Sequence, residues 1–156
     1  MSLQIESSFA PGGSISKKHT CEGSDSSPPL SWSGVPESTK SLVLIVDDPD
    51  APDPQKPQRV FVHWVLYNLP NDSDGLPEGA TASNLPPGAR EGRNDWDRVG
   101  YGGPCPPIGR HRYFHKLYAL DTVLPDLGAA KKADVERAME GHVLENVELV
   151  GTYEKE

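Results

Sequence analysis

Apolar residues are concentrated in three blocks, each bounded by polar segments rich in glycine and proline. The first block covers residues 41–46, where β-branched and aliphatic residues follow one another until Asp47. The second covers residues 60–67 and the third residues 111–120. Continuous apolar runs of this length indicate buried strands. The polar, proline-rich loop between the first two blocks favours antiparallel neighbours.

Weaker patterns predict the remaining elements. Residues 3–9 alternate as an edge strand does, and residues 27–32 form an extended segment that ends in a tryptophan. Apolar residues at helical spacing predict an amphipathic helix over residues 132–145, without an obvious N-cap, and a last strand over 147–153. Residues 70–110 show almost no periodicity. Such a long irregular segment in a compact domain is usually functional when it is ordered.

The composition favours a single domain with many turns. The chain has 156 residues, of which 35% are apolar, and it contains 15 glycines and 16 prolines but no internal repeat. A chain of this length can bury a core without metal or disulfide support. We therefore expect one domain over residues 1–156, with short strands rather than a helical bundle.

The net charge of −8 limits the classes of partner. A negative surface repels nucleic acids and anionic lipid headgroups at long range, so non-specific binding of nucleic acid is not expected. An anionic ligand would need a locally positive site. No apolar stretch is long enough to span a bilayer, and the first residues lack a signal-peptide pattern, so we expect a cytoplasmic location without membrane insertion.

The two cysteines, Cys21 and Cys105, are far apart in the sequence and do not form a CxxC pair. In a cytosolic protein two buried thiols are the favoured interpretation. A disulfide and a reactive thiol remain the alternatives.

Polar residues stand at two strand positions that packing alone would not favour. Asp48 and Asp50 follow a buried strand within Asp-Pro-Asp-Ala-Pro, where the prolines would fix a turn and aim both carboxylates at the rim of the sheet. Alternatively, this turn only ends the strand. His63 lies in the middle of an apolar strand, on the face of Phe61, Val65 and Tyr67 if side chains alternate. Taken alone, it is better explained as a core histidine bonded to a backbone carbonyl.

A third cluster is the glycine- and proline-rich segment 100–109 with the strand that follows it. Glycines allow backbone N–H groups to converge on an anion. His111 and Tyr113 project from one face of the strand and Arg112 from the other, where it is expected to pair with a carboxylate. Ordinary turn chemistry would also explain the glycines. Together the three clusters predict a pocket in which nearby carboxylates keep the imidazoles cationic and able to hold an anion.

These motifs resemble those of the phosphatidylethanolamine-binding protein family, also called Raf-kinase-inhibitor-like proteins. The order of the Asp-Pro-Asp-Ala-Pro segment, His63 and the Gly-Arg-His-Arg-Tyr segment at 109–113 is similar to the family's signatures. Further blocks at residues 27–32, 100–107 and 138–142 resemble its short bacterial and archaeal branch. The likeness extends from about Phe9 to Tyr153.

The resemblance implies a mainly β fold, with two antiparallel sheets packed together and a C-terminal helix. It also implies a non-catalytic protein that needs no cofactor or metal and binds a small anion, such as phosphate or the phosphoethanolamine headgroup of a phospholipid. A kinase or protease partner and a homodimer are further expectations. Family positions assign His111 and the Gly103 amide as anion donors, with Asp48, His63 and Tyr113 as walls. The expected ligand-binding residues are Asp48, Asp50, His63, Gly103, Pro104, His111 and Tyr113.

Three alternatives remain open. A hydrolase could use Asp48, His63 and His111 as acid–base groups, with Cys105 as the one candidate nucleophile. The same three residues could hold a metal ion, whereas His111 and His115 would be about 13 Å apart on a strand. Finally, the protein could inhibit a protease or kinase through a surface loop that is independent of the pocket.

Overall fold

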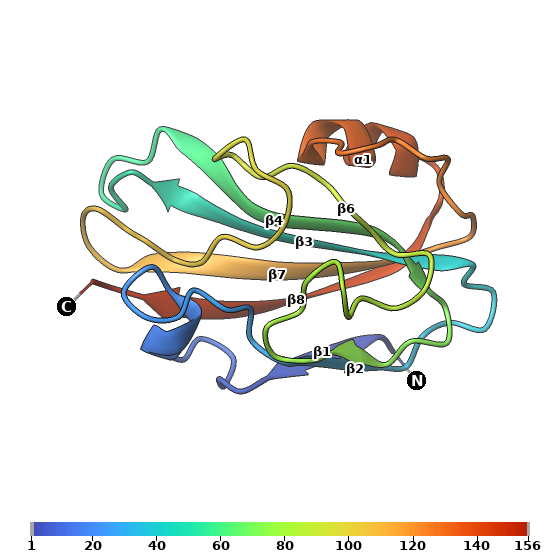
Figure 1. Cartoon of the computed structure of the whole chain (residues 1–156), viewed down its shortest axis with the longest axis horizontal. Helices are drawn as coiled ribbons and strands as arrows, with labels where there is room; N and C mark the ends of the chain where they lie inside the picture. The colour runs from blue at the N-terminus through green and yellow to red at the C-terminus, as the bar shows by residue number, and fades with distance from the viewer. Residues whose placement is uncertain (1, 156) are drawn as a thin grey trace.

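The computed structural model describes residues 2–155, which form two antiparallel sheets and one α-helix (Figure 1). The five-stranded sheet has the order β6-β4-β3-β7-β8, and the three-stranded sheet has the order β1-β2-β5. The large sheet consists of β3 (Ser41–Ala51), β4 (Arg59–Pro70), β6 (Arg90–Glu91), β7 (His111–Leu120) and β8 (Val143–Tyr153). The small sheet consists of β1 (Gln4–Ser7), β2 (Leu30–Ser33) and β5 (Gly75–Leu76), while α1 covers Lys132–Met139 and a 3₁₀ turn covers Lys17–His19.

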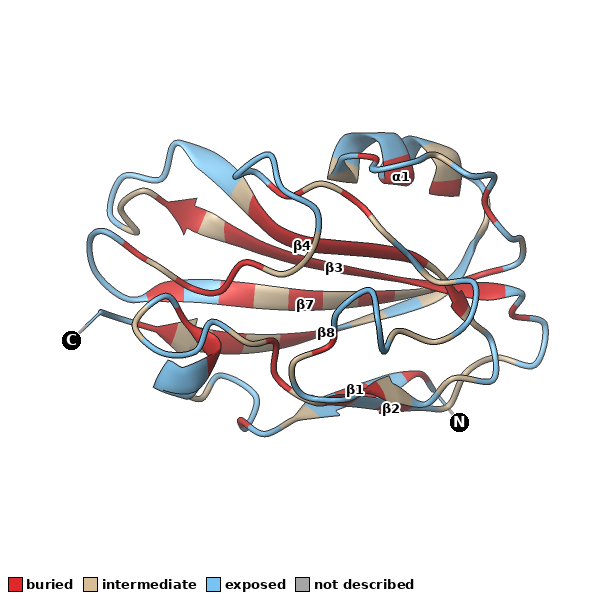
Figure 2. Ribbon diagram, in the orientation of Figure 1, coloured by how far each residue is buried: buried red, intermediate tan, exposed pale blue. Residues whose placement is uncertain are grey.

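The large sheet is the middle layer, with the small sheet on one face and α1 on the other (Figure 1). Alternation along β3 explains why its apolar run is continuous. Leu44 and Val46 face the core between the two sheets, whereas Val43 and Ile45 pack beneath α1. Figure 2 shows β3 and most of β4 as buried. The predicted mainly β fold with two packed antiparallel sheets and a helix near the C-terminus is confirmed.

Several predicted element boundaries are wrong. The last strand starts at Val143 instead of residue 147, and the strand predicted over 60–67 extends to Pro70. The strand predicted to stop at Asp47 continues to Ala51, because Asp47 still pairs with both neighbouring strands and its buried carboxylate binds Lys116 and Lys132 at 3.0 and 2.8 Å. The helix ends at Met139 instead of residue 145. Gly141 has a φ of 79°, and the chain then enters β8, which pairs with β7 from Val143 to Tyr153.

A β-bulge at His63 changes which face of β4 its neighbours occupy. Opposite β3, Val46 pairs with Trp64 and Asp47 with Val62, so His63 is the extra residue. Trp64 therefore packs between the sheets, while Val62, Val65 and Tyr67 all pack under the helix. The expectation that His63 shares a face with Val65 and Tyr67 is wrong, although its ring does contact Phe61.

The segment from 70 to 110 contains only the two-residue strands β5 and β6. From the rest of the segment, Trp96, Cys105, Pro106 and Pro107 line the site described below. None of the helices within residues 2–155 is long and apolar enough to cross a membrane.

Cys21 and Cys105 form a disulfide, with Cα atoms 5.4 Å apart. The favoured interpretation of two buried thiols is therefore wrong, and the alternative pairing is the one observed. Their 84-residue separation in sequence leaves no local signal for the bond, because the pairing depends on how the loops around the pocket fold together.

Candidate ligand-binding site

A pocket of about 230 Å³ opens where β3, β4 and β7 meet the loops at one end of the large sheet. It brings together four of the seven predicted residues: Asp48, His63, His111 and Tyr113. The remaining lining residues are Ala51, Pro52, Arg59, Phe61, Trp96, Cys105, Pro106 and Pro107.

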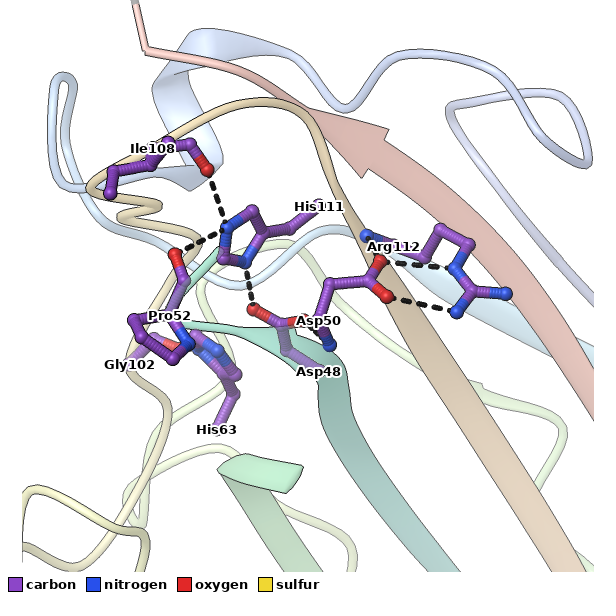
Figure 3. Close-up of polar contacts among 8 residues, drawn as sticks. All are labelled: Asp48, Asp50, Pro52, His63, Gly102, Ile108, His111 and Arg112. Carbon is purple, nitrogen blue, oxygen red and sulfur yellow. Dashed lines mark hydrogen bonds and ion pairs between the residues drawn. The ribbon is translucent and has the colours of Figure 1, made fainter. Parts of the chain in front are cut away.

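Asp48 and His111 form a buried pair at the base of the site (Figure 3). Asp48 Oδ2 lies 2.6 Å from His111 Nδ1, and Asp48 Oδ1 accepts the Asp50 N–H at 2.7 Å. His111 Nε2 faces the carbonyl oxygens of Ile108 and Pro52 at 2.8 and 3.1 Å. Since a carbonyl oxygen only accepts, Nε2 carries a proton, and a second proton lies between Nδ1 and Asp48. The pair is therefore neutral as a whole.

These hydrogen bonds leave His111 no N–H group for a ligand. The predicted role of His111 as an anion donor is thus not the one that its geometry favours. Its ring instead connects β7 to the turn at Pro52 and to the loop at Ile108. Burial raises the pKa of Asp48, with the bond from His111 acting in the opposite direction.

His63 is buried and donates from Nδ1 to the Gly102 carbonyl at 2.8 Å. Burial lowers the pKa of His63 to about 4, so the ring is neutral at pH 7. The expectation of a cationic imidazole is wrong here, because no carboxylate hydrogen-bonds this ring in the described structure. With Nδ1 protonated, Nε2 of the neutral ring is a hydrogen-bond acceptor.

The Tyr113 hydroxyl is buried and has no hydrogen-bond partner among residues 2–155. The ring packs edge-on against His63, with centroids 5.2 Å apart, and both residues line the pocket. Burial raises the pKa of Tyr113, so the group is a neutral phenol and a potential donor. An unsatisfied buried hydroxyl costs about 1–3 kcal/mol, which a ligand oxygen could recover.

Phe61, Trp96 and Arg59 line the outer part of the pocket, and Arg98 stacks on Trp96. Trp96 packs edge-on against Phe61 and His63, with centroid distances of 4.7 and 5.0 Å. The guanidinium of Arg59 lies 5.1 Å from the centre of the Phe61 ring, and that of Arg98 lies 5.8 Å from Trp96. Arg59 thus adds a positive charge to the pocket lining of an acidic chain.

The loop that carries Trp96 is fixed to the side of β4. Asp95 accepts the Val62 N–H through Oδ2 at 2.7 Å and donates its own N–H to the Val62 carbonyl at 3.0 Å. Asn94 Oδ1 accepts the backbone N–H groups of Trp96 and Arg98 at 3.0 and 3.2 Å. These bonds hold the Trp96 indole against Gly102. A Cβ atom on Gly102 would overlap the indole ring.

The other three predicted residues lie outside the pocket lining. Asp50 forms a two-pronged ion pair with Arg112, at 2.9 Å from Oδ1 to Nη2 and 3.0 Å from Oδ2 to Nε (Figure 3). This bears out the expected carboxylate partner of Arg112. The Gly103 N–H donates to Asp25 Oδ1 at 2.8 Å, and the Pro104 carbonyl accepts from the Cys21 N–H at 3.1 Å. Both residues face residues 20–25 instead of a ligand.

The sequence reasoning missed Arg59 and Trp96. Arg59 begins β4 two residues before Phe61, so strand alternation could have found it. Trp96 is a single large apolar residue in the polar run from Asn94 to Arg98. No group of three or more His, Cys, Asp or Glu side chains in residues 2–155 is arranged to hold a metal ion.

Comparisons with known proteins agree on one family. The family model described as phosphatidylethanolamine-binding protein matches residues 5–154. A UPF0098 protein of Methanothermobacter thermautotrophicus is 53% identical over 148 residues, which is 94% of this chain and 95% of the relative. The crystal structure of a phosphatidylethanolamine-binding protein homolog from Chlamydia trachomatis is 44% identical, with a TM-score of 0.91 over 99% of both chains. Escherichia coli YbcL, described as a new member of the mammalian family, is 34% identical, with a TM-score of 0.89 over 100% of both chains.

Proposed function

Because this chain belongs to the phosphatidylethanolamine-binding protein family, we propose that it is a non-catalytic binding protein for a small anion. The ligand is phosphate or a phosphate monoester such as the phosphoethanolamine headgroup of a phospholipid. The observation that carries this proposal is Tyr113, a residue that lines the pocket and whose buried hydroxyl has no partner among the described residues.

The pocket offers a phosphate both a donor and an acceptor. The Tyr113 hydroxyl donates to one ligand oxygen, and the Nε2 atom of neutral His63 accepts from a protonated one. A hydrogen bond to a charged group in a dry site is about twice as strong as one between neutral groups. Tyr113 and His63 therefore replace the pair that the sequence favoured as donors, which was His111 and the Gly103 amide.

The electrostatics of the site are compatible with an anion. The buried Asp48–His111 pair is neutral as a whole, so it does not repel a ligand as a free carboxylate would. Arg59 in the pocket lining supplies the local positive charge that an acidic chain needs. Arg59 is exposed and its ring contact with Phe61 orients it, so we assign it to the capture of the ligand.

The first test is the substitution Tyr113→Phe, measured by calorimetric titration with phosphate and with phosphoethanolamine. We expect affinity to fall about tenfold or more, because a hydrogen bond to a charged oxygen is worth about 1.5–3 kcal/mol. The free energy of unfolding without ligand should stay the same or rise slightly, because the hydroxyl bonds no protein group.

Tyr118→Phe is the matched control, since it removes the same atom from the same strand but outside the pocket. It should leave the affinity for both ligands unchanged. Equal affinities of wild type and Tyr113→Phe, or no measurable binding by wild type, would contradict the proposal.

The hydrolase alternative with Asp48, His63 and His111 as acid–base groups stays open. Cys105 was its one candidate nucleophile, and its sulfur is bonded to Cys21. Inhibition of a kinase or protease through a surface loop stays a prediction, as does the homodimer.

A further inference from the structure

The disulfide is part of the pocket. Cys105 lines it together with the two residues that follow, Pro106 and Pro107, while its partner Cys21 lies next to the 3₁₀ turn of residues 17–19. The bond thus joins one wall of the binding site to a segment far away in the sequence.

The disulfide is the covalent attachment of this wall, next to the hydrogen bond from the Cys21 N–H to the Pro104 carbonyl at 3.1 Å. Residues before Cys105 are held by hydrogen bonds, from the Tyr101 hydroxyl to the His19 carbonyl at 2.7 Å and from the Gly103 N–H to Asp25 at 2.8 Å. The two prolines after Cys105 have no N–H group to donate. Beyond them, the Ile108 carbonyl accepts from His111, so the position of the wall also affects the pair at the base.

The bond is accessible from solution. Cys21 is exposed, Cys105 is partly buried, and these are the two cysteines of the chain. We therefore take Cys21, the more exposed of the two residues, as the side from which a thiolate attacks. Exposed disulfides are the labile ones, whereas buried ones resist reduction.

We propose that the Cys21–Cys105 bond is a reversible redox switch that sets the affinity of the pocket for its ligand. The proposal rests on the proposed function. In the oxidised state the proline wall is fixed and the pocket is preorganised. In the reduced state the wall gains conformational freedom that the ligand must remove when it binds, so affinity falls.

The reductant is a dithiol, either a small molecule or a thioredoxin-like protein. One thiolate attacks Cys21 Sγ, which breaks the bond to Cys105 and releases the Cys105 thiolate. The second thiolate of the reductant then attacks the mixed disulfide and releases Cys21. Two electrons and two protons pass to the protein, and the reductant becomes a disulfide.

The test is calorimetric titration of the full chain with inorganic phosphate in three states: oxidised, reduced with excess dithiothreitol, and reoxidised after its removal. We expect about tenfold weaker binding in the reduced state and full recovery on reoxidation. Equal affinity in the oxidised and reduced states would overturn the switch but leave the proposed function intact. Absence of binding in every state would overturn both.

The double variant Cys21→Ser/Cys105→Ser is the control. It should bind phosphate as weakly as the reduced wild type and should not respond to dithiothreitol. A response of this variant to the reagent would show that the effect does not pass through the disulfide.

A second measurement does not depend on that variant. In reduced wild type, saturating phosphate should slow the alkylation of Cys105 by iodoacetamide more than that of Cys21, as quantified by peptide mass spectrometry. Equal protection of the two thiols would remove Cys105 from the binding site and overturn the proposal.

Near-ultraviolet circular dichroism of the reduced protein shows whether the core is retained. Loss of the core signal would mean that the weaker binding comes from unfolding, which would overturn the switch.

Discussion

At the scale of single residues, two histidines are held neutral inside the fold. His63 and His115 are both buried, and burial lowers the pKa of each to about 4. His115 Nδ1 faces the carbonyls of Tyr113 and Leu149 at 3.2 and 3.3 Å. Neither ring has a carboxylate hydrogen-bonded to it in the described chain. Protonation in acid would therefore place a positive charge on each ring in a buried site that does not solvate it.

The stability of the protein should therefore fall in mild acid. In the unfolded chain a histidine titrates near 6.5, so between about pH 6.5 and 4 the unfolded state binds more protons than the folded state. Unfolding then becomes easier as pH falls, by up to roughly 3 kcal/mol per histidine. Urea denaturation at a series of pH values from 7 to 4.5 measures this loss.

His115→Gln should remove about one proton from the pH dependence of unfolding. His142→Gln is the control, because the half-exposed side chain of His142 pairs with Asp121 at the surface. The raised pKa of Asp48 acts in the opposite direction but equally in all three proteins. If His115→Gln keeps the wild-type slope, His115 is not neutral in the fold.

The sequence located most of the pocket residues but assigned several partners wrongly. Motif positions predicted Asp48, His63, His111 and Tyr113, and the structure brings all four together. They could not show that carbonyl oxygens surround His111 or that Asp25 takes the Gly103 N–H. Hydrogen-bond partners of this kind come from loops that are far apart in the sequence. Local sequence patterns do not show which of these loops lie together in the fold.

At the scale of elements, strands were predicted more reliably than their irregularities. The strand at 111–120 was predicted with its observed bounds, because its composition and its flanking turn agree. The bulge at His63 arises from the register of β4 against β3, which the sequence of β4 alone does not contain. The predicted helix is too long because apolar residues continue at helical spacing past Met139. In the structure, residues from Val143 onward pair with β7 as a strand instead.

The contact of the loop around Trp96 with Gly102 gives a test at this scale. In Gly102→Ala, the new Cβ would overlap the indole ring, so Trp96 must leave its place over His63. We expect phosphate affinity to fall several-fold in calorimetric titration, with a loss of stability of about 1–3 kcal/mol from overpacking.

Gly128→Ala is a useful comparison for this substitution. An added Cβ there meets no atom within 4 Å, although its φ of 67° carries a backbone cost of its own. It should lower stability without changing affinity. An unchanged affinity in Gly102→Ala would mean that Trp96 does not shape the binding site.

At the scale of the whole molecule, the disulfide closes a loop of more than half the chain. By loop-closure entropy, such a cross-link stabilises the fold by roughly 4 kcal/mol. Cys21→Ser/Cys105→Ser should lose about this much free energy of unfolding in urea denaturation, and reduced wild type should match it. A loss below about 1 kcal/mol would mean that the unfolded chain is already compact without the bond.

Both edges of the large sheet are partly covered by other segments of the chain. On one side, the N–H groups of Gly12 and Ile15 donate to the carbonyls of Val150 and Thr152 at 2.7 and 2.8 Å, which covers the C-terminal half of β8. On the other side, β6 is only two residues long. Beyond it, Asp95 hydrogen-bonds both the N–H and the carbonyl of Val62, so these groups are not free to pair with another strand. Exposed strand edges are the usual templates for aggregation. The segments that build the binding site and tether the N-terminal region thus also shorten the strand edges through which concentrated protein could polymerise.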